Sequence, residues 1–207
     1  MKRLIFICSV VMMGSSFAVS AEEVIDYGPL AKMIGKWQTV QAGGVDMAPG
    51  QEGSAVGKGG PAVEPFYEVL TVEEAATATN ASEQHLAALS YVQEVFRKRD
   101  GVKFHDQRGF FLYDKEKQMV YNVFCIPRAT CVVAEGAAGE RLQLKATKEL
   151  GQVAESEFMH KKDSTTAFMY QLDISEPDKI KYNQVTSLQV YDKPFNHTDS
   201  SVLERVK

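Results

Sequence analysis

The sequence predicts an all-β domain, built as a sandwich or a barrel. Three observations predict it: apolar and polar residues alternate over short segments, turn signals separate these segments at a spacing of about 8–12 residues, and one tryptophan opens the first segment. Trp37 stands in the sequence Gly35-Lys-Trp37. A bulky indole here can plug one end of a barrel, and the glycine makes room where the entering chain crosses it.

The elements follow in order along the chain. Residues 30–34 predict one helical turn before Gly35. The segment 85–96 fits a helix or a strand by its periodicity, and its aromatic and β-branched residues favour a strand. The clearest alternation predicts strands at residues 66–72, 119–125, 141–145, 168–174 and 179–192.

Seven glycines lie between Gly43 and Gly60, within 18 residues. Few packed elements tolerate so many, so residues 43–60 predict a long mobile loop. Their spacing does not match a phosphate-binding loop.

The N-terminus has the features of a secretory signal over residues 1–21. Lys2 and Arg3 precede an apolar run over residues 4–13, and small residues end at Ala21. The run is too short to span a membrane, which takes about 20 apolar residues. We therefore expect a periplasmic or secreted protein, with one mature domain over residues 22–207 and no transmembrane segment after cleavage.

Charge and cysteines agree with this interpretation. Losing the two positive charges of the signal changes the formal charge from −4 to −6, which argues against nucleic acid as a partner. Cys125 and Cys131 remain in the mature chain, and an oxidising compartment allows them to form a disulfide across a tight hairpin. A redox-active pair is the weaker alternative, because the spacing is not Cys-x-x-Cys.

The four histidines are the candidate metal ligands, and their spacing forms no zinc motif. His105 precedes a glycine in an aromatic strand, and His197 follows a turn and enters the last strand. On residue chemistry alone, each is more typical of a hydrogen-bonded structural histidine than of a ligand.

Taken together, these motifs make the chain similar to the nitrobindin family. The resemblance rests on five segments in order, residues 33–37, 66–68, 105–110, 132–136 and 182–206. It implies a single antiparallel up-and-down β-barrel of the calycin, fatty-acid-binding-protein-like class. Gln107 stands where the family has a glutamate, and the spacing after His197 differs by one residue. On a strand such a shift exchanges the inner and outer faces.

The resemblance also implies a cofactor and a site. Haem b would bind in the barrel mouth, with His197 as the iron ligand and His105 as a pocket residue. Asn196, Thr198 or Asp199 is expected to orient the His197 ring. The implied small-molecule partners are nitric oxide and peroxynitrite, and the implied enzyme activity is peroxynitrite isomerisation. The alternatives are a haem-free carrier of a lipid or another apolar molecule, and a structural module of the envelope.

Overall fold

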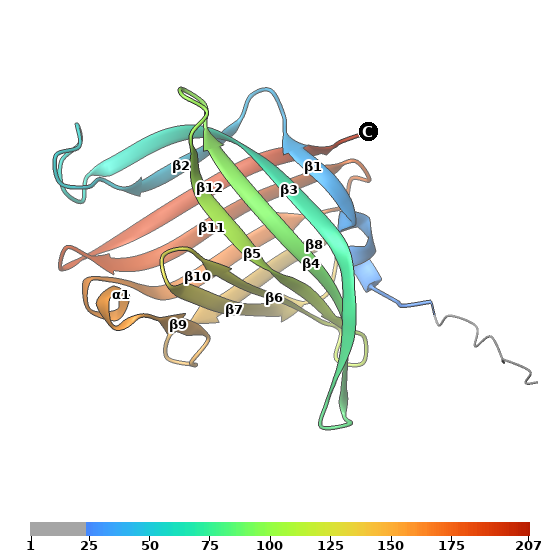
Figure 1. Cartoon of the computed structure of the whole chain (residues 1–207). Helices are drawn as coiled ribbons and strands as arrows, with labels where there is room; N and C mark the ends of the chain where they lie inside the picture. Colours follow the sequence, from blue (N-terminus) through green and yellow to red (C-terminus); the bar gives the residue numbers. More distant parts are fainter. Residues whose placement is uncertain (1–23) are drawn as a thin grey trace, which may run out of the picture.

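The computed structural model describes residues 24–207, so the expected signal over residues 1–21 lies outside the described residues. The chain is almost entirely β-structure (Figure 1). A 3-10 helix, η1 (Gly28–Met33), comes first, and a short α-helix, α1 (Glu157–Lys162), comes late in the chain. The strands are β1 (Gly35–Thr39), β2 (Gly44–Pro49), β3 (Pro61–Asn80), β4 (Gln84–Arg97), β5 (Lys103–Asp114), β6 (Met119–Ile126), β7 (Thr130–Ala137), β8 (Arg141–Thr147), β9 (Val153–Glu155), β10 (Asp163–Asp173), β11 (Lys179–Val190) and β12 (Lys193–Arg205).

The strands close into one antiparallel barrel. Most strands pair with their sequence neighbours, and β1 and β2 both pair with β3 on one side and β12 on the other. Strands β8 and β9 likewise both pair with β7. Each of these two sets shares one place in the wall, so the barrel has ten strand positions. The predicted up-and-down β-barrel is confirmed.

Buried apolar side chains pack together inside the barrel. The inward faces of the strands carry a continuous apolar core that includes Trp37, Phe111, Phe124, Phe168 and Tyr170. Two of these rings, Phe124 and Phe168, lie 5.1 Å apart between centroids. The segment 85–96 belongs to β4, so the expectation of a strand there is correct.

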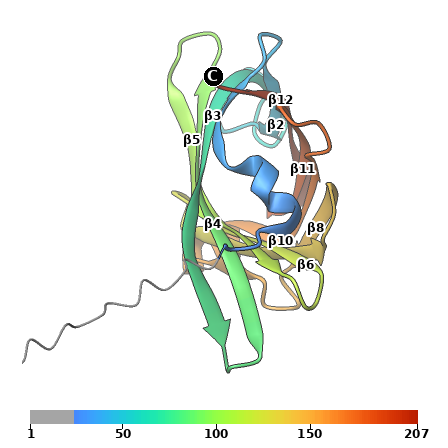
Figure 2. The same cartoon turned by 90° about the vertical axis from the view of Figure 1, so that its right-hand side faces the viewer.

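Helix η1 lies across one end of the barrel (Figure 2). Trp37 is the third residue of β1, is 1% exposed, and donates from Nε1 to the carbonyl of Met33, the last residue of η1, at 2.7 Å. The Arg205 guanidinium lies over the indole, 4.1 Å from the ring centroid. The predicted tryptophan plug is therefore present, and Arg205 of β12, near the C-terminal end of the sequence, covers it.

The expectation of a loop over residues 43–60 is wrong for its first third, because residues 44–49 form β2. Gly44 is required there for space, since a Cβ atom would come within 2.3 Å of the Phe66 ring. The remaining glycines form turns closed by two backbone hydrogen bonds of 2.7 Å, from Gly50 to Gly60 and from Gly59 to Gly50. The mobility of this segment stays a prediction.

Strands β6 and β7 form a short hairpin in which Cys125 and Cys131 are direct partners. Their sulfur atoms are bonded, which confirms the predicted disulfide. Among residues 24–207, no helix is long and apolar enough to cross a membrane.

Candidate functional site

Strand β12 directs His197 into the barrel. Its pairing with β11 runs without a register shift from Lys193 to Glu204. His197 therefore shares a face with Ser201 and Leu203, which are 6% and 0% exposed. The one-residue difference in spacing noted in the sequence does not turn the ring outward, because the regular alternation of β12 sets its direction.

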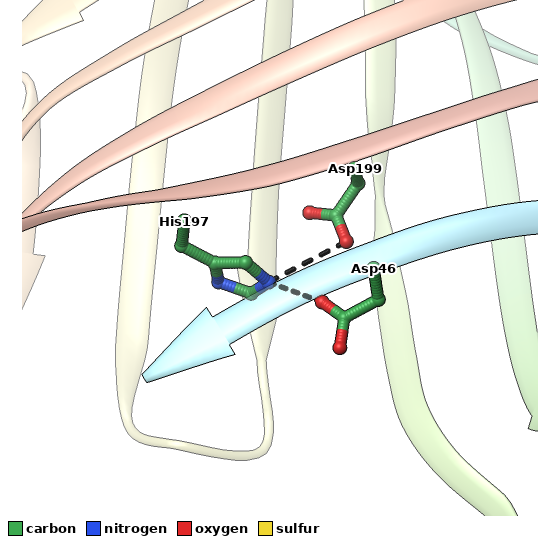
Figure 3. A group of neighbouring side chains, drawn as sticks. All are labelled: Asp46, His197 and Asp199. Atoms are coloured by element: carbon green, nitrogen blue, oxygen red, sulfur yellow. Dashed lines mark hydrogen bonds and ion pairs between the residues drawn. The ribbon is translucent and has the colours of Figure 1, made fainter. Parts of the chain in front are cut away.

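Two carboxylates meet the His197 ring (Figure 3). The Asp46 Oδ1 atom on β2 lies 2.5 Å from Nε2 of His197, and the Asp199 Oδ1 atom lies 3.4 Å from the same nitrogen. Asp46 and Asp199 are direct cross-strand partners, so the pairing of β2 with β12 brings both to the imidazole. The three side chains are 9%, 18% and 25% exposed for Asp46, Asp199 and His197.

The carboxylates change the protonation of the ring. Burial alone lowers the pKa of His197, but the contacts with Asp199 and Asp46 outweigh it and raise that pKa to about 10. Burial raises the pKa of Asp46. The neighbouring Asp199 adds to that rise in the pKa of Asp46, and the contact with His197 opposes it. Near neutral pH, His197 is an imidazolium between two carboxyl groups.

The residues expected to orient His197 are placed differently from the expectation. Asp199 contacts Nε2, the nitrogen that an iron ligand needs, and not the other ring nitrogen. Asn196 instead accepts a hydrogen bond from Ser187 at 3.1 Å, and Thr198 pairs with Met47 on the other face of β12. Asp46 was not predicted at all, because it lies in the glycine-rich segment expected to be a loop. The signal that could have found it is the acidic residue between two apolar ones in Val45-Asp46-Met47.

His105 lies on the inward face of β5, in the same alternating set as Gln107 and Phe111. Burial lowers its pKa, and the positive charge of His197 lowers it further. The two histidines named from the sequence therefore face the same interior region. Gln107 is 5% exposed and donates to the Tyr91 hydroxyl at 2.7 Å. The residue that replaces the family glutamate is a neutral donor in the core.

Comparison with protein families identifies the family to which this chain belongs. The model of the THAP4-like, heme-binding beta-barrel domain matches residues 26–205. The chain belongs to this family. The match covers every strand of the barrel and includes Asp46, His105, His197 and Asp199. It is consistent with the resemblance to nitrobindins seen in the sequence.

Solved structures agree with the THAP4-like fold. The chain is similar to Rv2717c from M. tuberculosis, at 16% identity and a TM-score of 0.58, over 86% of this chain and 95% of that one. It is also similar to the S-type phycobiliprotein lyase CPES from Guillardia theta, at 11% identity and a TM-score of 0.51, over 86% and 90% of the two chains. At these identities the likeness shows the fold alone. A comparison with curated proteins gives no match.

Proposed function

We propose that this THAP4-like barrel is an exported haem-binding protein in which His197 is the axial ligand of the iron. The observation that carries the proposal is the direction of His197, which points into a barrel of a heme-binding family. Imidazole is a common axial ligand of haem iron. The proposed cofactor is haem b.

The donor set fits haem iron with one condition. An iron ligand needs a ring nitrogen with a free electron pair, and Nε2 of His197 is engaged by Asp46. Ligation therefore requires the ring to lose its proton and the Asp46 carboxyl group to leave Nε2. The ring already faces inward and its side chain is a quarter exposed, while the carboxyl group that has to turn away belongs to Asp46 on β2.

Bound haem would supply reactivity with nitric oxide, or the isomerisation of peroxynitrite to nitrate, as the resemblance implies. The residues of this chain hold and tune the site. His197 would hold the iron through Nε2, and Asp46 and Asp199 would place negative charge on the iron-binding side of the ring. His105, kept neutral by burial, is the proposed pocket residue.

The carrier alternative receives less support from the interior. An apolar ligand prefers an apolar lining, and the region around His197 presents two carboxylates and a second histidine.

We also propose that residues 1–21 direct export. Intact mass of protein from the periplasm, with alkylation without reductant, tests both export and the disulfide between Cys125 and Cys131. Retention of residues 1–21 would contradict a cleaved export signal, and two alkylated thiols would contradict the disulfide.

Haem titration followed by absorption tests the ligand. The wild-type protein should give the Soret and visible bands of a histidine-ligated haem, and His197→Ala should lose them while its circular dichroism stays unchanged. His105→Ala should keep the ligation, and His160→Ala, which removes an exposed histidine of α1, is the matched control. An unchanged spectrum in His197→Ala would remove this residue as ligand. If the wild-type protein binds no haem, lipid extraction with mass analysis tests the carrier alternative.

A further inference from the structure

The contacts around His197 include more donors than a haem ligand needs. One atom from each of Asp46, His197 and Asp199 can be chosen so that all three lie within 4.8 Å of one another. The donors come from β2 and β12, two strands that pair directly, so the backbone fixes their spacing (Figure 3). A third strand supports the group, because Gln184 on β11 donates to Asp199 Oδ2 at 3.2 Å and leaves Oδ1 facing His197. Such supporting hydrogen bonds are typical of ligating carboxylates.

The charge of this group is unbalanced. Asp46 and Asp199 are opposite each other on the inward face, an arrangement that is unfavourable for like charges. Within residues 24–207, neither carboxylate forms an ion pair with a lysine or an arginine, and each pairs only with His197. One imidazole cannot neutralise two carboxylates, so the group carries net negative charge and favours a cation.

We propose that Asp46, His197 and Asp199 form a binding site for a divalent first-row transition-metal cation of the zinc class. Imidazole nitrogen combined with carboxylate oxygens suits such ions, whereas calcium and magnesium prefer oxygen ligands alone. The three side chains leave at least one coordination position for water or a small ligand. The side chain of His197 is a quarter exposed, so solvent reaches the site.

The site needs only a local adjustment to accept the ion. Metal–ligand distances of about 2.0–2.2 Å in a tetrahedral site separate the ligand atoms by roughly 3.4 Å. Asp199 Oδ1 is already 3.4 Å from Nε2. Asp46 Oδ1, at 2.5 Å, would move away by about 1 Å while the ion replaces the proton between the two groups.

This inference goes beyond the proposed function, because haem uses only the imidazole of this group and the cation also needs both carboxylates. The two ligands also share Nε2 of His197. Binding of one should therefore exclude the other, and the cation site belongs to the haem-free form of the barrel.

Zinc titration by calorimetry tests the site on tag-free protein cleared of haem and metal. The wild-type protein should bind one Zn²⁺, and Co²⁺ should give the visible absorption of a low-coordinate nitrogen and oxygen site. Asp199→Asn and Asp46→Asn should each weaken Zn²⁺ binding by at least about tenfold, the smallest loss typical of residues that support a ligand. His160→Ala should bind as the wild type does, and Mg²⁺ should bind more weakly than Zn²⁺. Circular dichroism confirms that each variant is folded.

Two results would overturn the inference: a folded wild-type protein that takes up no Zn²⁺, or an Asp199→Asn variant with wild-type affinity. The haem proposal is tested independently of the cation site. Asp199→Asn keeps His197 and should keep the histidine-ligated haem spectrum, while prior Zn²⁺ loading should reduce haem uptake in the wild-type protein only. Zinc binding that depends on both aspartates, in a protein that never binds haem, would leave the cation site standing and remove the proposed function.

Discussion

The Tyr182 hydroxyl lies 3.0 Å from each carboxylate oxygen of Glu68, across the barrel interior from β11 to β3. Glu68 is 1% exposed and also accepts a hydrogen bond from Gln93. Burial raises the pKa of Glu68, and these hydrogen bonds only partly oppose it. Among residues 24–207 no lysine, arginine or histidine pairs with it, so hydrogen bonds alone hold this buried carboxyl group.

The first prediction concerns the pH dependence of stability at Glu68. A raised folded-state pKa means that the contribution of Glu68 to stability is fully present below its unfolded pKa of about 4.3 and is lost as the pH rises through the folded pKa. Glu68→Gln keeps an acceptor for Tyr182 and removes this loss. Its free energy of unfolding near pH 7 should equal or exceed that of the wild-type protein.

Urea unfolding of both proteins at a series of pH values measures this. The comparison variant is Glu68→Ala, which leaves the Tyr182 hydroxyl without its acceptor and should cost about 1–3 kcal/mol. A Glu68→Gln protein as unstable as Glu68→Ala at neutral pH would contradict the assignment.

The second prediction concerns the ion pair at the candidate site. Because the folded pKa of His197 is about 10, above the ordinary 6.5, the stabilisation is fully present below pH 6.5 and is lost as the pH rises through about 10. Asp46→Asn should lower the pKa of His197 and reduce stability near pH 7 by about 2 kcal/mol. Nuclear magnetic resonance of the imidazole protons against pH, with urea unfolding, measures both. A His197 that titrates near 6.5 in the wild-type protein would refute the pairing.

The third prediction concerns Gly35, which has a φ of +132°. A Cβ atom there would lie 2.8 Å from Nη1 of Arg205, the side chain that covers Trp37. Gly35→Ala should therefore lower the free energy of unfolding by about 1–3 kcal/mol. Gly139→Ala is the control, because its Cβ would meet nothing within 4 Å. Equal unfolding midpoints for the two variants would show that Gly35 is not constrained.

The fourth prediction concerns the remaining glycine-rich turns, residues 50–60. Ordering many glycines is costly in conformational entropy, so we expect these turns to be the most mobile part of the domain. Trypsin should cut first after the exposed Lys58, and Lys58→Gln should remove that early fragment. Hydrogen exchange should be fast across the same residues. Strong protection there, or first cleavage at another turn, would contradict the prediction.

The sequence by itself determined the β class, the strands with clear alternation, the disulfide and the position of His197. These features follow from local patterns, because side chains alternate along a strand and a short hairpin places Cys125 opposite Cys131. Strand β2 was not predicted, because it depends on a contact with a distant strand and not on a local pattern. Its first glycine is selected by the Phe66 ring of another strand, and no local pattern records that contact.

Only the tertiary structure decided which face of β12 lies inside and what meets His197 there. Asp46 and His197 are 151 residues apart in sequence, and closure of the barrel through β2 and β12 brings them into contact. The protonation of the site depends on this contact, since two carboxylates and burial together set the charge of the ring. Long-range strand pairing is set by the packing of the whole core, which is why a local reading of the sequence could name His197 and Asp199 but not Asp46.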